Sequence, residues 1–188
     1  MYKVFVPLLL GFALDAASAF TTVYSRRWGK SRGELVSFVL RNVLGIPLWM
    51  VSLGFAVQSP SPLVFAASRA SLILGWLLLA AGATIQTFAL VVLRLRAARP
   101  SVDDALATKG VYAHVRHPIY AGLLLEFAGL VLVKPRQTVL LAAALGAVWV
   151  WVQARFEEKD LVDRMPQYQE YMNRVPRFVP RLARKGKA

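Results

Sequence analysis

Long apolar runs alternate with short polar connections along this chain, and their lengths predict helices that cross a membrane. A helix needs about 20 apolar residues to cross the hydrocarbon core of a bilayer. The runs lie at 4–24, 35–57, 70–93, 119–133 and 138–156. The first three meet the required length. The last two are shorter and are joined by Lys134-Pro135-Arg136, so they predict a helical hairpin that polar residues at its ends extend.

Prolines mark where these helices should bend, begin and end. Pro47 lies inside the second run and predicts a kink or a local loosening of the helix. Pro118 falls where the fourth helix should begin, a position that tolerates its missing N–H. The fifth helix should continue beyond the apolar run until Met165-Pro166 breaks it. A further short helical segment, 167–173, should follow on the cytoplasmic side.

Composition places the chain among integral membrane proteins. Hydrophobic residues make up 57% of it and charged residues only 18%, which excludes an ordinary soluble domain. Strands are excluded because an open sheet edge in lipid would leave backbone groups unpaired. We therefore predict an all-α protein with five transmembrane helices and one domain, 1–188. Within it, a three-helix scaffold (1–95) should precede the part that carries the chemistry (96–188).

The net charge of +13 raises the alternative of nucleic-acid binding, but the positions of the charges favour a membrane surface. Of the 23 Lys and Arg residues, four lie in 25–33, five in 94–118 and nine in 155–188, whereas the loop 58–68 has none. The positive-inside rule then puts the N-terminus outside a prokaryotic inner membrane and the C-terminus in the cytoplasm. The expected partners of these charges are anionic membrane lipids, not nucleic acid.

Some kinds of chemistry are excluded by residues that the chain lacks. It has no cysteine, which removes disulfides, thiolate nucleophiles and sulfur-ligated metals. It has two histidines, and no helix carries histidine and carboxylate at the spacing of metal ligands. We therefore expect no metal site.

Two polar signatures follow the apolar runs. The first, at 110–122, reads Gly-Val-Tyr-Ala-His-Val-Arg-His-Pro-Ile-Tyr-Ala-Gly, and the second combines Glu157-Glu158 with Tyr-x-x-Arg-Val-Pro at 171–176. This pairing resembles the isoprenylcysteine carboxyl methyltransferase family, which belongs to a wider group of small membrane methyltransferases that includes phospholipid N-methyltransferases. The resemblance covers about the last 80 residues. It implies that both signatures fold into one recess at the inner membrane surface.

The resemblance also implies a cofactor, S-adenosylmethionine, with S-adenosylhomocysteine as the product. Backbone N–H groups at the start of a helix favour an anion, and His117 lies where such a helix should begin. Glycine allows close approach of a ligand to the backbone. The residues expected to bind the cofactor are Gly110, Val111, Tyr112, His114, Arg116, His117, Tyr120, Gly122, Glu157 and Glu158. Taken one at a time, each has an ordinary explanation as a helix cap, membrane anchor or solvated side chain.

Arg174, Arg116 and Glu158 are the candidate catalytic residues. The resemblance assigns Arg174, together with Arg116, the task of steering an acceptor carboxylate, for which the planar guanidinium is suited. The favoured reaction is O-methylation of a carboxylate on a lipophilic, isoprenyl-type acceptor. N-methylation of a phospholipid amine is the alternative, and it needs a base such as Glu158. Met165-Pro166-Gln167 stands where the family has Phe-Gly-Glu, which leaves the acceptor open.

Charged residues inside the apolar runs also require an explanation. Asp15, Arg41 and Glu126 each cost at least about 2.5–3.5 kcal/mol inside a bilayer, so each should face protein or a wet cavity. Arg41 could extend its charge toward the interface. Glu126 could line an acceptor tunnel, pair with Arg41 or make a structural polar bridge. A non-catalytic scaffold or transporter would also place such groups here, although the chain shows no internal repeat.

Overall fold

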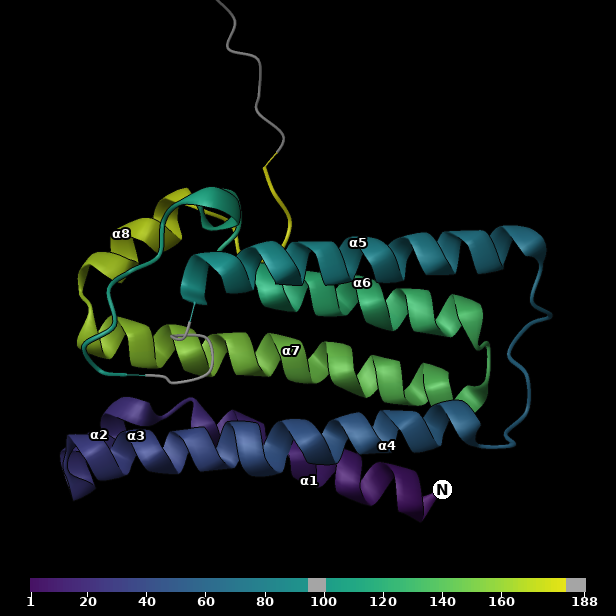
Figure 1. The fold of residues 1–188 in the computed structure, drawn as a ribbon, viewed down its shortest axis with the longest axis horizontal. Helices are drawn as coiled ribbons and strands as arrows, with labels where there is room; N and C mark the ends of the chain where they lie inside the picture. The colour runs from purple at the N-terminus through teal and green to yellow at the C-terminus, as the bar shows by residue number, and fades with distance from the viewer. Residues whose placement is uncertain (95–100, 182–188) are drawn as a thin grey trace, which may run out of the picture.

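The computed structural model describes residues 1–94 and 101–181, and this part of the chain is helical (Figure 1). β-structure within it is limited to an isolated bridge between Leu63 and Arg136. The elements are α1 (Tyr2–Ser18), α2 (Thr21–Trp28), α3 (Lys30–Phe38), the π-helix η1 (Val39–Gly45), α4 (Ile46–Gln58), α5 (Arg69–Leu93), the 3₁₀ helix η3 (Gly110–Ala113), α6 (Pro118–Val133), α7 (Gln137–Arg164) and α8 (Gln167–Arg174). The all-α prediction is confirmed, whereas the boundary expected at 95/96 lies outside the described residues.

The predicted count of five membrane spans is not confirmed in full. Three helical stretches in the described residues are long and apolar enough to cross a bilayer: Lys30–Gln58, Arg69–Leu93 and Gln137–Arg164. A fourth is counted if α1 and α2, which meet at a bend of 63°, form one broken span. Helix α6 has 16 residues, or about 24 Å of length, which is less than the roughly 30 Å of a hydrocarbon core.

The helices form two groups with α7 between them (Figure 1). Helices α5 and α6 run side by side, and α1 packs against α4 on the other side of α7. Helices α2, α3 and α8 lie together at one end of the molecule. The starts and ends follow the prolines, since α6 begins at Pro118 and α8 follows a break at Met165-Pro166.

Pairs of glycines allow α5 and α6 to approach closely. A Cβ atom on Gly82 would lie 2.5 Å from the carbonyl oxygen of Gly122, and one on Gly122 would lie 2.6 Å from that of Gly82. Gly75 and Gly129 face each other in the same way, at 2.9 and 2.7 Å. Small residues of this kind are typical of helix contacts in membranes. Gly122, which was expected to approach the cofactor, is therefore a helix-packing residue.

The predicted loosening near Pro47 is confirmed as the π-helix η1. The N–H of Ile46 donates to the carbonyl of Arg41, five residues back. Pro47 has no N–H with which to resume the ordinary hydrogen-bond pattern at once. Gly45 lets η1 approach α1, because a Cβ there would lie 2.9 Å from the backbone nitrogen of Asp15. This contact brings two charged residues of the apolar runs, Asp15 and Arg41, into one region.

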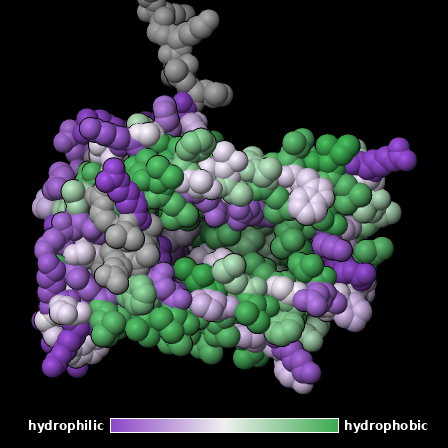
Figure 2. Space-filling view, viewed as in Figure 1, coloured by the Kyte–Doolittle hydropathy of each residue, from purple (hydrophilic) through white to green (hydrophobic). Residues whose placement is uncertain are grey.

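The surface separates into an apolar body and a polar end (Figure 2). Hydrophobic side chains cover much of the body, and purple, hydrophilic residues gather at the end where α2, α3 and α8 lie. Large side chains on α4 and α5 are more than half exposed, among them Met50, Phe55, Trp76, Leu77 and Phe88. Exposure of this extent suits contact with lipid.

Candidate functional site

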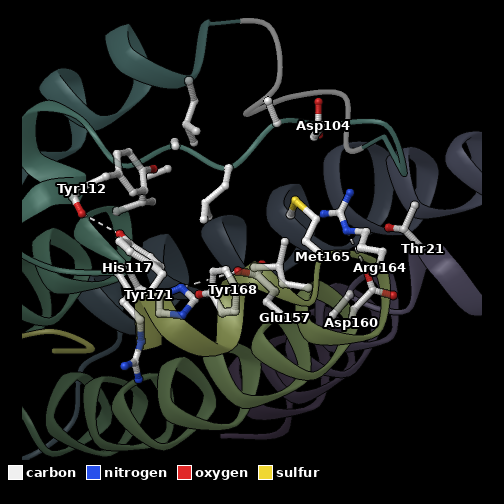
Figure 3. A pocket seen from close by; sticks show the side chains of 18 of the residues that line it. Thr21, Asp104, Tyr112, His117, Glu157, Asp160, Arg164, Met165, Tyr168 and Tyr171 are labelled. Atoms are coloured by element: carbon white, nitrogen blue, oxygen red, sulfur yellow. Dashed lines mark hydrogen bonds and ion pairs between the residues drawn. The ribbon is translucent and has the colours of Figure 1, made fainter. Parts of the chain in front are cut away.

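A cavity lies at the polar end, where α6 begins and α7 leaves the apolar body (Figure 3). Five of the residues that the sequence analysis selected line it: Tyr112, Arg116, His117, Tyr120 and Glu157. The remaining wall includes residues that it did not assign to a cofactor site. These come from the N-terminal helices, the connection after α5, and α7 and α8: Ser18, Thr21, Arg41, Asp104, Asp160, Arg164, Tyr168 and Tyr171.

His117 joins the two signatures. It is buried immediately before α6, and its Nε2 atom lies 3.2 Å from Oε1 of Glu158. Its Nδ1 atom lies 3.7 Å from Oε2 of Glu157. The backbone N–H groups of Arg116 and His117 donate to the carbonyls of Pro176 and Arg177 at 2.8 and 3.0 Å. The expectation that both signatures fold into one place is therefore confirmed.

Glu157 faces the cavity. Its Oε1 atom accepts hydrogen bonds from the Tyr120 hydroxyl at 2.5 Å and from Nε2 of Gln153 at 3.2 Å. The same oxygen lies 3.5 Å from Nη2 of Arg41. Glu157 thus connects the signatures to the N-terminal helices, and it is one carboxylate on the wall that a ligand in the cavity can reach.

Glu158 does not line this cavity, and its carboxylate binds two arginines. Oε1 accepts from Nε of Arg116 at 3.0 Å and from Nε of Arg177 at 3.0 Å, and Oε2 accepts from Nη2 of Arg177 at 2.5 Å. The Glu158 side chain is 5% exposed, so its charge needs these partners. Adjacent residues of a helix point about 100° apart, which explains why the two glutamates face different surroundings.

Arg116 lies between the cavity and the end of α8. Its Nη1 atom donates to the carbonyls of Met172 and Val175 at 2.7 and 2.8 Å, and its Nη2 atom lies 2.9 Å from Glu158. The last carbonyls of a helix lack partners within the helix. Arg116 supplies partners here and attaches α8 to the rest of the site. Its expected role in steering an acceptor stays a prediction.

Arg174 lies on an exposed face of α8, and its expected catalytic role stays a prediction. Its guanidinium pairs with Glu170, one turn back on α8, at 3.3 Å, and the two side chains are 70% and 72% exposed. Arg174 does not line the cavity. The arginine of this segment that reaches the buried carboxylate is Arg177, three residues later. Its hydrogen bonds with Glu158 raise the pKa of Arg177.

Three other predicted cofactor residues lie around the cavity but not on its wall. Gly110 has a φ of +61°, a left-handed conformation that favours glycine, and it opens the turn that carries Tyr112 inward. Val111 is half-buried and His114 is exposed, and neither lines the cavity.

Tyrosines of α8 form part of the cavity wall. The Tyr171 hydroxyl donates to the backbone carbonyl of Tyr112 at 2.5 Å. Burial raises the pKa of Tyr171 to about 12, so its hydroxyl remains a hydrogen-bond donor at neutral pH. Burial also raises the pKa of Tyr168, which packs against Tyr171. The fold thus places these aromatic rings on the wall of the same cavity as Glu157 (Figure 3).

Helix α7 continues the site beyond the predicted residues. Glu157, Asp160 and Arg164 occur at spacings of three and four, which places them along one side of the helix. Asp160 accepts from the backbone N–H of Thr22 at 2.9 Å, near the start of α2. Nε of Arg164 lies 3.5 Å from Asp160. This helical spacing was the signal in the sequence that could have identified both residues.

Of the charged residues in the apolar runs, Glu126 makes a structural polar bridge. Its Oε2 atom accepts from Nε2 of Gln86 on α5 at 2.9 Å. Asp15 accepts from Nε1 of Trp49 at 3.3 Å. Arg41 pairs with Glu157, so the considered pairing of Arg41 with Glu126 is wrong. The N-terminal part is therefore more than a scaffold, since it supplies Arg41 to the cavity wall.

Comparison with known proteins places the chain among membrane methyltransferases. A family model described as phospholipid methyltransferase matches residues 70–169. A methanethiol S-methyltransferase of Pseudomonas deceptionensis is 35% identical over 120 residues, which are 59% of this chain and 44% of that protein. A methanethiol S-methyltransferase of another Pseudomonas species is 34% identical over 152 residues, which are 77% of this chain and 54% of that protein.

A third relative is not named as a methyltransferase. The cobalt-zinc-cadmium resistance protein CzcN of Cupriavidus metallidurans is 33% identical over 82 residues, which are 43% of this chain and 38% of that protein. The chain thus spans about half, or less, of the length of these relatives. No solved structure matches it significantly.

Proposed function

The chain belongs to the phospholipid methyltransferase family, and from this premise we propose that it transfers a methyl group from S-adenosylmethionine to a lipophilic acceptor at a membrane surface. The observation that carries this proposal is the position of His117, between Glu157 and Glu158, beside a cavity at the polar end of an apolar helical bundle. A water-soluble donor and a lipid-soluble acceptor can meet only at such an interface.

The side chains of the cavity suit this donor. Methyl transfer is an in-line displacement at a carbon that the sulfonium already activates, so the protein has to hold donor and acceptor aligned and away from water. Glu157 and Asp160 would hold the ammonium and ribose groups. Arg164, next to Asp160, offers a partner for the donor carboxylate. The adenine can lie against the tyrosine rings of the wall: Tyr112, Tyr168 and Tyr171.

Two acceptors have specific support. The signatures 110–122 and 171–176 favour a carboxylate on a lipophilic molecule. The names of the relatives favour a thiol, since two of them are methanethiol S-methyltransferases. Both groups attack the methyl carbon as anions. A phospholipid amine has to lose a proton first, and that reaction needs a base such as Glu157.

Binding of S-adenosylhomocysteine to the detergent-purified protein tests the donor. We expect saturable heat of binding in calorimetry and a weaker affinity in His117→Ala. Folded protein that binds no S-adenosylhomocysteine would favour a non-catalytic membrane scaffold.

Products from a methyl-labelled donor test the acceptor. Incubation with a lipid extract should yield a label that base releases as methanol if the product is an ester. Incubation with an alkanethiol should yield a stable thioether. Label that remains on a phospholipid headgroup after base treatment would identify N-methylation instead.

The location of the site is also part of this proposal. The basic connections, which lie on the same side of the membrane as α8, favour a cytoplasmic site in a prokaryotic inner membrane. The donor would then enter from the cytosol, and the acceptor from the lipid.

A further inference from the structure

Arg41 contributes a positive charge to the cavity from outside the region that the family model matches. That region begins at residue 70, whereas Arg41 lies in η1. The shape of η1 decides where this side chain points, because its wider turn changes the direction of the residues on it. Short π-helical segments of this kind occur frequently at functional sites. The segment that carries Arg41 is thus a local departure from regular helix on the cavity wall.

The guanidinium of Arg41 has more N–H donors than its contact with Glu157 uses. Among the described residues its ion pair is with Glu157, at 3.5 Å, a longer distance than a good hydrogen bond. Arg116, on the same wall, has bonds of 3.0 Å or less from Nε, Nη1 and Nη2. A guanidinium has five N–H groups. Most of those of Arg41 have no hydrogen-bond partner within residues 1–94 and 101–181, so a group in the cavity can bind them.

Glu157 does not fill the hydrogen-bonding capacity of Arg41. The Oε1 atom of Glu157 already accepts from Tyr120 at 2.5 Å and from Gln153 at 3.2 Å. Asp15 interacts with Arg41 electrostatically from α1, but its hydrogen bond is to Trp49. Both carboxylates lower the cost of a buried cation without occupying its donors. An arginine held in this way can bind an anion that enters the cavity.

The surroundings of Arg41 fit the acceptor better than the donor. Ala19, Ile119 and Tyr120 also line this cavity, and Tyr120 contacts the Glu157 oxygen that Arg41 faces, so apolar and aromatic groups accompany Arg41 on the wall. Asp104, Asp160 and Arg164 lie together at another part of the cavity, away from His117 (Figure 3). That part can hold the amino-acid group of the donor. The acceptor's reacting group is then the anion that remains for Arg41.

We infer that Arg41 binds the reacting group of the acceptor as an anion, so that this protein methylates thiols or carboxylic acids in preference to amines. The inference rests on the proposed methyl transfer and narrows its acceptor. An ammonium group would be repelled by Arg41, whereas a thiolate or carboxylate gains a charge-assisted contact. The specificity for the acceptor would thus come from the N-terminal helices.

Methyl transfer to a thiol needs a proton acceptor, whereas transfer to a carboxylate does not. A thiol passes its proton to the Glu157 carboxylate, and the thiolate beside Arg41 attacks the methyl carbon of the donor. The new S–C bond forms as the donor's S–CH₃ bond breaks, and the electron pair of that bond stays on the donor sulfur, which becomes a neutral thioether. A carboxylic acid enters already ionised and needs no base.

Three probes of equal chain length test the inference: octanethiol, octanoate and octylamine. We expect the wild-type protein to methylate octanethiol or octanoate and to leave octylamine unchanged. Arg41→Gln should lower kcat/KM for the accepted probe by about 10–100-fold, the loss expected for a hydrogen bond to a charged group. Its affinity for S-adenosylhomocysteine should stay within about twofold. Arg41→Lys should recover part of the activity, because it restores the charge without the planar fork.

Arg26→Gln is the matched control, since it removes an arginine from the exposed surface of α2. A pH profile separates binding of the anion from a structural role. With octanethiol, the rise of kcat/KM with pH should move to higher pH in Arg41→Gln, because the thiolate loses a stabilising cation. Arg26→Gln should leave both the rate and the profile unchanged.

Calorimetry with octanoate and octylamine tests the role of Arg41 even if neither probe is methylated. Octanoate should bind the wild-type protein more tightly than octylamine does, and Arg41→Gln should lose this preference. Octylamine that binds or reacts as well as octanoate or octanethiol would overturn the inference, as would an Arg41→Gln variant that keeps the preference. Failure of S-adenosylhomocysteine to bind would instead reject the proposed methyl transfer, and octanoate binding would still show whether Arg41 holds anions.

Discussion

Glu157 and Glu158 are neighbours in the chain, yet their carboxylates have different surroundings. Glu157 faces the cavity and contacts Tyr120 and Arg41. Glu158 is 5% exposed and accepts hydrogen bonds from Arg116 and Arg177. Because Arg116 also binds the end of α8, Glu158 organises the wall on which a ligand would lie.

Glu158→Gln should destabilise the protein strongly. It leaves Arg116 and Arg177 without their shared anion, and removal of one partner of a buried ion pair costs about 3–5 kcal/mol. Unfolding in detergent, followed by circular dichroism, measures the loss. Glu170→Gln is the matched control, because Glu170 is 72% exposed and should change stability by no more than about 0.5 kcal/mol. Equal effects of the two substitutions would contradict the role given to Glu158.

Two arginines near the C-terminus should respond differently to substitution. Arg177→Ala removes hydrogen bonds to a buried carboxylate, so we expect a loss of about 1–3 kcal/mol and weaker binding of S-adenosylhomocysteine. Arg174→Ala should leave stability and donor binding nearly unchanged, because Arg174 is 70% exposed and pairs only within α8 among the described residues. The same unfolding and calorimetric measurements apply. A catalytic role for Arg174 would appear as lost turnover with normal binding.

At the level of the elements, contacts between backbones determine how the helices pack. Gly82 and Gly122 bring α5 and α6 together, and Gly45 brings η1 against α1. The first contact holds α6 at the angle that puts His117 and Tyr120 beside α7. The second brings Asp15 close to Arg41. The positions of the site residues therefore depend on glycines that do not line the cavity.

Gly82→Ala should destabilise the contact between α5 and α6. Its Cβ would lie 2.5 Å from the Gly122 carbonyl oxygen, so the helices would have to separate, and overpacking of this kind costs about 1–3 kcal/mol. Gly54→Ala on α4 is the control, since no atom lies within 4 Å of its Cβ. That substitution should be neutral or slightly stabilising, because alanine favours helix. Thermal unfolding of the two variants in the same detergent tests the difference.

At the scale of the whole molecule, the difference between the apolar body and the polar end predicts how the protein is oriented across the membrane. The site, η3 and α8 lie at the polar end, and the connection between α4 and α5 lies at the other end (Figure 1). The basic residues gather on the side of the site. The positive-inside rule then predicts that the two ends face different compartments.

Single-cysteine labelling tests this orientation directly. The chain has no cysteine, so an introduced one is its only thiol. Ala67→Cys lies in the connection between α4 and α5, and Lys109→Cys lies just before η3; both positions are exposed. In intact cells, a membrane-impermeant maleimide should label Ala67→Cys and should label Lys109→Cys only after the membrane is opened. Labelling of both cysteines from one side would contradict the predicted topology.

Local features of the sequence were sufficient to predict the helices. Apolar runs and prolines act on the backbone nearby, so they predicted the start of α6 at Pro118, the loosening before Pro47 and the break at Pro166. The same features did not determine the number of spans, because that number depends on where helices bend in three dimensions. The bend between α1 and α2, for example, divides a run that reads as continuous in the sequence.

The sequence by itself determined the two signatures, the family that they indicate and the meeting of His117 with Glu157 and Glu158. The tertiary structure decided which of these side chains reach the cavity. It put Arg174 on an exposed face and Gly122 in a helix contact, and it added Arg41 and Asp160 to the wall. The physical reason is that helical spacing determines which residues share a face. Which way that face points depends on the packing of the neighbouring helices, and here Gly45 and Gly82, which lie outside the signatures, take part in that packing.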